Sequence, residues 1–182
     1  MKSYPIINGR KIRLAILGCG RISKNHFDSI EKHKKDVELV SICDDDQSVL
    51  AIHEKKYNIK GYLDLASMIE NVDLDLVIIC TPSGLHAEQT EICSKKGINI
   101  MTEKPMATRW NDGIRMVKAC DQAGVRLFVV KQNRNNPTIK LLQRAIKENR
   151  FGKIHMVHLN VFWSRPQSYY DQATWRGTWE FD

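Results

Sequence analysis

The sequence lacks long apolar runs. No stretch approaches the ~18 consecutive apolar residues that a membrane-spanning helix needs. The first residues, Met1–Pro5, also lack the apolar core and small-residue cleavage site of a secretory signal. We therefore expect neither secretion nor membrane insertion, and we expect a cytoplasmic protein.

Paired cysteines are absent as well. The 5 cysteines are far apart, at Cys19, Cys43, Cys80, Cys93 and Cys120, and no histidine stands at metal-ligand spacing beside them. We interpret them as small buried hydrophobic residues of a reducing compartment. Neither a metal nor a disulfide is expected.

The charge is unbalanced toward the positive side, with 28 Lys and Arg against 21 Asp and Glu, a net charge of +7. We interpret the lysines as scattered over solvated helix faces. Because no basic arm, zinc finger or aromatic-basic platform occurs, nucleic acid is not an expected partner. A nucleotide substrate would need only a local basic pocket, which total charge does not reveal.

Strand patterns alternate with helix patterns over most of the 182 residues. Strands are expected at residues 12–17, 37–43, 59–62, 75–80, 98–102 and 126–130. Helices are expected at residues 22–34, 46–57, 63–69, 85–96, 111–123 and 137–150. This alternation predicts an α/β fold, a doubly wound parallel sheet of the Rossmann type, over residues 1–150. Residues 151–182 are expected to open a second α+β domain, incomplete here, with a strand at 154–163.

The run Gly18-Cys19-Gly20-Arg21-Ile22-Ser23 stands between a predicted strand and a predicted helix. In such a turn the first glycine permits the tight bend and the second lets a pyrophosphate approach the backbone at the helix N-terminus. Ser23 replaces the usual third Gly or Ala and is still small. The alternative is a plain strand-to-helix turn.

Asp44 ends the second predicted strand, where an acid accepts hydrogen bonds from the adenosine ribose. A carboxylate there repels a 2′-phosphate, which favours NAD over NADP. Asp44 is alternatively part of an acidic cluster at a helix N-terminus.

Three further strand ends carry polar residues. Thr81-Pro82-Ser83-Gly84-Leu85-His86 follows the fourth strand, and its pattern alone predicts a surface histidine. Glu103-Lys104-Pro105 follows the fifth, where a partly buried Lys104 would transfer protons; the isomer of Pro105 stays open. The run from Lys131 to Pro137 follows the sixth. Carboxyl ends of such strands face the ligand crevice, although a solvated lysine and a helix-capping loop are the plain alternatives.

Together these motifs resemble the glucose-fructose oxidoreductase/inositol dehydrogenase/MocA (Gfo/Idh/MocA) family of NAD(P)-dependent sugar dehydrogenases. The matching elements are the glycine turn, Asp44, Thr81-Pro82 with His86, Glu103-Lys104-Pro105, and Asn133-Arg134 before Pro137. The tail, residues 162–182, is similar to the branch that uses NAD to oxidise the 3-hydroxyl of UDP-N-acetylglucosaminuronate (UDP-GlcNAcA) for bacterial surface polysaccharide, such as O-antigen.

The resemblance implies a role for each site residue. Lys104 would be catalytic, and substrate contacts would come from Lys104, Asn133, Arg134 and Arg165. The cofactor contacts would be Gly18, Gly20, Arg21, Ile22, Asp44, Thr81, Pro82, His86, Glu103, Lys104, Trp175 and Arg176.

In the family, an Asn and a His on a later helix complete the catalytic group and most of a second sheet follows. Neither the helix with this Asn and His nor the rest of the second sheet is expected within residues 1–182. We therefore expect this chain alone to bind NAD weakly and to be inactive, and the longer protein to be a homo-oligomer. The alternatives are a dehydrogenase for another sugar or polyol, and a non-catalytic NAD-binding sensor of the same fold.

Overall fold

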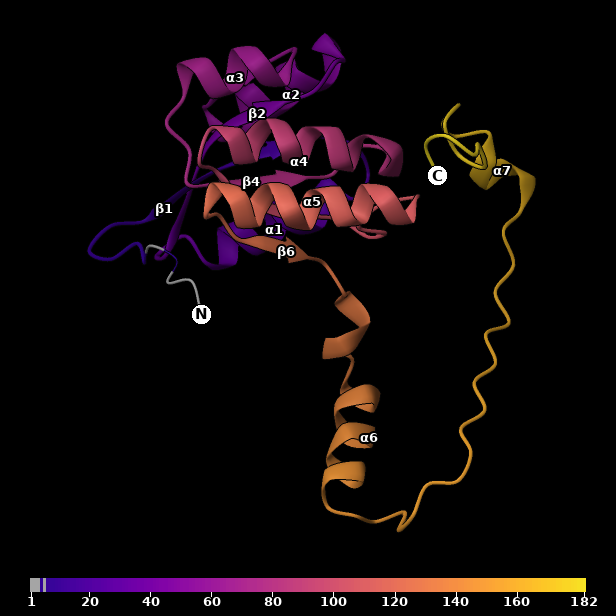
Figure 1. Ribbon diagram of the computed structural model, residues 1–182. Coiled ribbons are helices and arrows are strands. Elements are labelled where there is room, and N and C mark those ends of the chain that lie inside the picture. Colours follow the sequence, from indigo (N-terminus) through magenta and orange to yellow (C-terminus); the bar gives the residue numbers. More distant parts are fainter. Residues whose placement is uncertain (1–3, 5) are drawn as a thin grey trace. The chain divides into compact units, whose positions relative to one another are not determined.

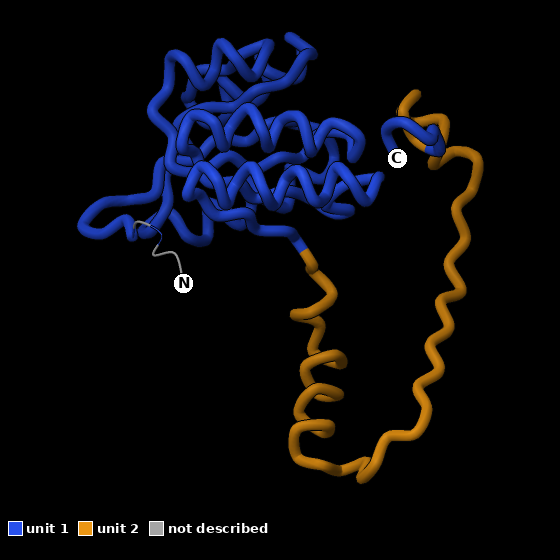
Figure 2. The backbone as a smooth tube through the Cα atoms, viewed as in Figure 1, with its two compact units in different colours: residues 1–130, 177–182 blue, residues 131–176 orange. Residues whose placement is uncertain are grey.

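The computed structural model describes Tyr4 and residues 6–182 (Figure 1). The chain divides into two units, coloured separately in Figure 2. Unit 1 comprises Met1–Val130 with Gly177–Asp182, and unit 2 comprises Lys131–Arg176. Each unit is described by itself.

Unit 1 is built on one parallel sheet of 6 strands in the order β3-β2-β1-β4-β5-β6. The strands are β1 (Ile12–Leu17), β2 (Val37–Cys43), β3 (Lys60–Tyr62), β4 (Leu76–Ile79), β5 (Asn99–Thr102) and β6 (Leu127–Val129). Between them run α1 (Ser23–Lys32), α2 (Gln47–Tyr57), α3 (Leu65–Asn71), η1 (Ser83–Leu85), α4 (His86–Lys95) and α5 (Trp110–Ala123). The predicted doubly wound sheet is confirmed.

Both faces of this sheet are buried. Along β1, Leu14 and Ile16 belong to one apolar cluster, which includes Phe27 of α1. Ala15 and Leu17 belong to another, with residues of the helices on the opposite face. Because successive side chains of a strand point to opposite faces, a doubly covered strand needs apolar residues throughout. This is why β4 is a continuous apolar run, Leu76–Ile79.

Asp75 holds the amino ends of β1 and β4 together. Its carboxylate accepts hydrogen bonds from Arg10 Nη2 at 2.8 Å and from the Arg13 main-chain N–H at 2.8 Å. The hydrogen bond from Arg10 lowers the pKa of Asp75 below its ordinary value, against the opposing effect of burial. Asp75 is therefore ionised and paired in the folded protein.

Unit 2 contains η2 (Gln132–Asn135), α6 (Pro137–Lys147) and α7 (Gln167–Tyr170). The strand predicted at 154–163 is wrong: the structure has no strand in this segment. A strand is stable only beside a hydrogen-bonded neighbour, and the described residues provide none for this segment. Its apolar side chains are exposed, Phe162 at 96%.

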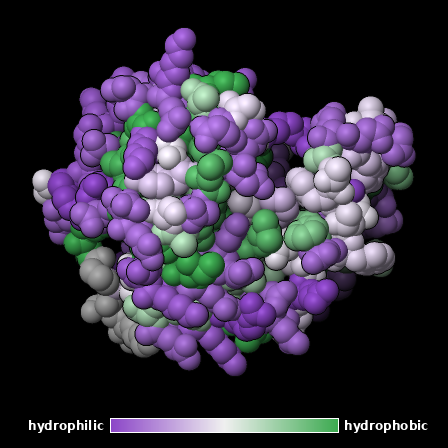
Figure 3. All heavy atoms as spheres, turned by 90° about the horizontal axis from the view of Figure 1, so that it is seen from above, coloured by the Kyte–Doolittle hydropathy of each residue, from purple (hydrophilic) through white to green (hydrophobic). Residues whose placement is uncertain are grey.

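The net charge is confined to unit 2, which holds 9 Lys and Arg against 2 Asp and Glu and so carries +7. Unit 1 holds 19 of each sign. The lysines of the unit 1 helices are exposed as expected, for example Lys32, Lys55 and Lys95, but acidic residues balance their charge. Hydrophilic side chains cover much of the face seen in Figure 3, with smaller apolar areas between them. None of the described helices combines the length and apolarity of a membrane span.

We predict that Asp75→Asn lowers the free energy of unfolding by ~1–3 kcal/mol at neutral pH, because a charged hydrogen-bond acceptor is lost from a half-buried site. Since folding lowers the pKa of Asp75, its contribution is present above about pH 4 and is lost as the pH falls through the folded-state pKa. Urea unfolding of both proteins at several pH values measures this. Asp73→Asn is the control, because the Asp73 side chain is 95% exposed. Equal stability of Asp75→Asn and wild type at neutral pH would refute the prediction.

Candidate functional site

The carboxyl ends of β1, β2, β4 and β5 meet at one edge of the sheet, because all pairs are parallel. The glycine turn, Asp44, Thr81 and Glu103 follow these four strands in that order. The structure therefore brings together, at this edge, the predicted site residues of unit 1.

Gly18 lies where no other residue fits. Its φ is +88°, and a Cβ there would lie 2.8 Å from the Thr81 main-chain nitrogen. Its own N–H donates to the Cys43 carbonyl oxygen at 2.7 Å. Gly18 thus packs the turn against the ends of β2 and β4, as the strand-turn-helix motif requires.

Gly20 differs, because a Cβ there would have no atom within 4 Å. This open backbone lies just before α1 and could accommodate a diphosphate at the helix N-terminus. Ser23 is 1% exposed, and its hydroxyl donates to the Gly20 carbonyl oxygen at 2.6 Å. The serine at the third motif position therefore closes the turn with a hydrogen bond as well as being small.

Asp44 lies against the glycine turn. Its Oδ2 accepts from the Cys19 main-chain N–H at 2.6 Å, and its Oδ1 from the Asp46 N–H at 3.0 Å. The N-cap of α2 is Asp46, whose carboxylate accepts from the Ser48 N–H at 2.8 Å. Of the acidic cluster that was the alternative for Asp44, Asp46 caps the helix, whereas Asp44 contacts the glycine turn.

His86 is 1% exposed, so the prediction of a surface histidine is wrong. Its Nδ1 lies 3.0 Å from the Pro105 carbonyl oxygen, and its Nε2 lies 3.0 Å from that of Thr81. A neutral imidazole donates to one of these oxygens and an imidazolium to both. His86 therefore joins the loop after β4 to the loop after β5, a contact that local pattern does not reveal.

Glu103 is 7% exposed and points inward. Its Oε1 lies 2.8 Å from His26 Nε2 on α1, and its Oε2 accepts from the Lys104 N–H at 3.2 Å. Burial raises the pKa of Glu103, but the hydrogen bonds from His26 and Lys104 outweigh it, and the pKa is lowered overall. Glu103 is thus held as a carboxylate.

Lys104 is exposed rather than partly buried, and the Lys104–Pro105 peptide bond is cis. Sequence reasoning missed His26. The available signal was its spacing: His26 follows Ser23 by three residues, which places it on the buried face of α1 that Ser23 and Phe27 form.

The cysteines fill the core as predicted, since all 5 are free and buried. Burial raises the pKa of both Cys19 and Cys43 to about 12, so these thiols beside the glycine turn are unreactive at neutral pH.

Unit 2 holds the other predicted residues. Asn133 and Arg134 are exposed on η2. The Arg165 guanidinium lies 3.9 Å from the Trp163 ring centroid and 4.7 Å from that of Tyr169. The Arg176 guanidinium lies 4.5 Å from the Tyr169 ring and 5.7 Å from the Trp175 ring. The contacts of these residues with cofactor or substrate stay predictions.

Within unit 1, the segment Gly177–Asp182 packs on η1. The Gly84 N–H donates to the Phe181 carbonyl oxygen at 3.2 Å, and a Cβ on Gly84 would collide with the Glu180 carbonyl. Sequence analysis did not anticipate this contact, which lies directly after Thr81-Pro82-Ser83.

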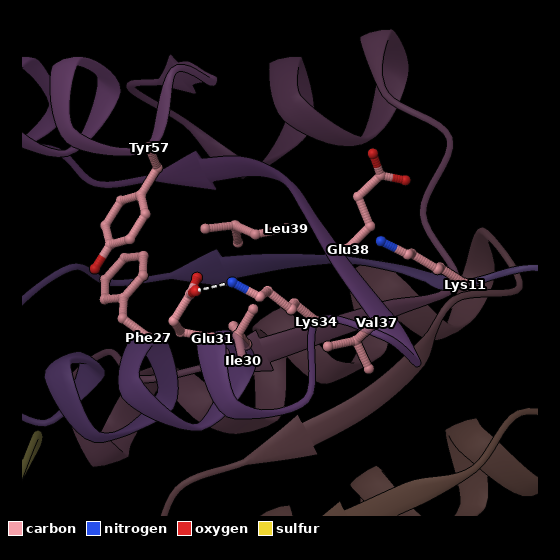
Figure 4. A pocket seen from close by; sticks show the side chains of 9 residues that line it. All are labelled: Lys11, Phe27, Ile30, Glu31, Lys34, Val37, Glu38, Leu39 and Tyr57. Atoms are coloured by element: carbon pink, nitrogen blue, oxygen red, sulfur yellow. Dashed lines mark hydrogen bonds and ion pairs between the residues drawn. The ribbon is translucent and has the colours of Figure 1, made fainter.

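A cavity lies at the opposite edge of the sheet, beside the amino ends of β1 and β2 (Figure 4). Lys11, Phe27, Leu39 and Tyr57 contribute to its wall, and Glu31 and Lys34 form an ion pair there at 2.6 Å. Its position separates it from the site residues at the carboxyl ends of the strands.

The chain belongs to the GFO_IDH_MocA oxidoreductase family, which has an NAD-binding Rossmann fold and whose model matches residues 12–131. It is similar to the WlbA dehydrogenase of Chromobacterium violaceum, solved in complex with NADH and UDP-GlcNAcA. The identity is 55% and the TM-score 0.96, covering 100% of this chain and 53% of that chain. The Bordetella pertussis WlbA dehydrogenase, solved with the same two ligands, is 53% identical with a TM-score of 0.92, covering 95% and 53%.

Among curated relatives, D-apiose dehydrogenase of Paraburkholderia graminis is 31% identical over 86% of this chain and 40% of its own length. D-glucoside 3-dehydrogenase of Escherichia coli is 34% identical over 80% and 42%. The chain thus spans about half the length of the relatives it matches.

We predict that Gly20→Ala preserves the fold and weakens NADH binding, because its methyl group fills open space where a diphosphate would lie. The methyl group would push the diphosphate away from the main-chain N–H groups of the turn. Losing such hydrogen bonds to a charged group costs ~1.5–3 kcal/mol, which corresponds to ~10- to 100-fold in affinity. Fluorescence titration with NADH and urea unfolding measure the two effects. Gly18→Ala is the contrasting variant and should lose ~2 kcal/mol or more of stability through backbone strain and collision. Unchanged NADH affinity in Gly20→Ala would contradict this account.

Proposed function

We propose that this chain is the cofactor-binding part of an NAD-dependent dehydrogenase that oxidises the 3-hydroxyl of UDP-GlcNAcA. The observation that carries the proposal is the 55% identity over the entire chain with a dehydrogenase solved with NADH and UDP-GlcNAcA. The site geometry supports it independently, because Gly20, Asp44 and Glu103-Lys104 follow strands that end at one edge of the sheet. A place in surface-polysaccharide synthesis and a homo-oligomeric state are predictions from the resemblance, and a cytoplasmic location is a prediction from the sequence alone.

The residues of unit 1 fit a dinucleotide. Gly20 leaves backbone open at the start of α1, and Asp44 lies beside the turn with its carboxylate 2.6 Å from the Cys19 N–H. The main chain of residues 18–23 would hold the diphosphate, and Asp44 would accept from the ribose hydroxyls. The carboxylate would repel a 2′-phosphate, so NAD is favoured over NADP. When bound, the nicotinamide supplies the hydride acceptor.

Lys104 is the residue we assign to the proton of the reacting hydroxyl. It follows β5, and the adjoining main chain is fixed on one side through Glu103 and on the other through Pro105. In its neutral amine form Lys104 would accept a hydrogen bond from the hydroxyl and then take its proton, while the hydride of the same carbon goes to the nicotinamide and the alcohol becomes a ketone. Such a positioned acid-base group contributes ~10²- to 10⁴-fold to a rate.

We predict that Lys104→Ala lowers turnover ~10²-fold or more while NADH affinity changes little. A suitable protein is a chimera in which these 182 residues replace the matching half of the Chromobacterium violaceum enzyme. NADH formation from UDP-GlcNAcA is followed by absorbance. Lys118→Ala, at an α5 position remote from the sheet edge, is the control. Wild-type turnover by Lys104→Ala would remove this residue from the mechanism.

The substrate charge is a further testable point. Unit 2 carries a net charge of +7, including Arg165 and Arg176 near Tyr169. A nucleotide sugar with a uronate carboxylate complements such a unit better than a neutral sugar or polyol does. We therefore predict a kcat/KM for UDP-GlcNAcA at least ~10-fold above that for UDP-GlcNAc, as expected for one charged hydrogen bond. Equal values would favour another sugar, and no NADH from any nucleotide sugar would favour a non-catalytic sensor.

A further inference from the structure

Two histidines hold the Glu103-Lys104-Pro105 loop from different sides. His26 on α1 contacts the Glu103 carboxylate at 2.8 Å, and His86 on α4 contacts the Pro105 carbonyl oxygen at 3.0 Å. Neither contact involves the lysine side chain. Both act on the main chain or side chain of the residues flanking Lys104.

The contact through His26 is the more specific of the two. The side chains of His26 and Glu103 are only 12% and 9% exposed, so water replaces their interaction poorly. The two carboxylate oxygens have separate tasks: Oε1 faces His26 Nε2, and Oε2 accepts from the Lys104 N–H. The Glu103 N–H in turn donates to the Ile79 carbonyl oxygen of β4 at 2.9 Å. Both carboxylate oxygens of Glu103 and its main chain are therefore held by hydrogen bonds.

We propose that His26 is a positioning residue, which orients the Lys104 main chain by holding the Glu103 carboxylate in the one orientation that reaches the Lys104 N–H. His26 lies on α1, the helix that begins at the glycine turn. The same helix thus presents its N-terminus toward the expected diphosphate and supports the residue assigned to proton transfer. This inference rests on the proposed function, since it takes Lys104 as the residue that handles the proton.

The alternative is that the His26–Glu103 pair is only a buried structural contact. Removing one partner of a buried pair leaves the other uncompensated and destabilises the fold in either case, so stability does not distinguish the two roles. What distinguishes them is whether the Lys104 N–H loses its acceptor, and whether turnover falls without a matching loss of NADH binding.

The direct test is amide hydrogen exchange at Lys104, measured by NMR in the 182-residue chain. We expect exchange at least ~10-fold faster in His26→Ala than in wild type, because the carboxylate is freed and the N–H loses its acceptor. His26→Gln, whose amide can still donate to Glu103, should restore slow exchange. His33→Gln is the matched control, since His33 is an exposed C-cap of the same helix.

Turnover in the chimera supplies the second readout. In His26→Ala we expect kcat to fall ~10-fold or more, as for a misplaced reacting group, with the KM for NAD and the NADH affinity within about 3-fold of wild type, and His26→Gln to recover most of kcat. Unchanged Lys104 exchange in His26→Ala would overturn the proposal. So would a fall in kcat that parallels a loss of NADH binding and that His26→Gln does not repair.

If His26→Ala does not fold, His26→Leu replaces it, because leucine fills the space of the ring and cannot donate to Glu103; unchanged exchange at Lys104 in that variant overturns the proposal. If the wild-type chimera forms no NADH from any nucleotide sugar, the proposed function fails, whereas the exchange measurement still decides whether His26 orients Lys104.

Discussion

The close approach of the turn after β1 to the end of β4 is the constraint on which the site depends. At Gly18 the main chain passes so near the peptide between Cys80 and Thr81 that a Cβ would lie 2.8 Å from the Thr81 nitrogen. The contact fixes the turn against two strands at once, because the Gly18 N–H also donates to the Cys43 carbonyl oxygen. Asp44, the next residue of that second strand, can then reach the Cys19 N–H. The open backbone at Gly20 is thus positioned by the close packing of Gly18, two residues earlier.

A second link joins the cofactor half of the sheet edge to the half that carries Lys104. Burying a carboxylate is costly unless hydrogen bonds and an opposing group compensate, and Glu103 receives both, from Lys104 N–H and from His26. Its pKa is lowered despite burial, so the charged form is retained where an uncompensated carboxyl would be protonated. His86 adds a link from the loop after β4. Helix α1 and the loops after β4 and β5 are thus tied together by polar groups that lie inside the protein.

The sequence predicts most of unit 1 because its strands are covered on both faces. Strands β1 and β2 have the bounds expected from the pattern, 12–17 and 37–43. Failures occur where a residue's environment depends on a distant partner. His86 is buried because two carbonyl oxygens from separate loops surround it, and its own helix gives no sign of this. His26 escaped notice for the same reason. The apolar alternation at 154–163 indicates a strand, but without a neighbouring strand the described chain forms none. Local pattern thus predicts which residues are apolar, not which partner will cover them.

The two units differ in net charge. Unit 1 carries equal numbers of acidic and basic residues, although the ligand of its family is an anionic dinucleotide. Main-chain N–H groups and a helix N-terminus suffice for a diphosphate at a fixed place, so a net positive charge is unnecessary there, and Asp44 can select against a further phosphate. Unit 2 concentrates a charge of +7 on a short segment. A long-range positive field of this kind attracts anions from solution without discriminating among them. Fixed backbone donors in unit 1 suit one anionic cofactor at a defined place, and the cationic side chains of unit 2 suit the anionic substrate that we propose.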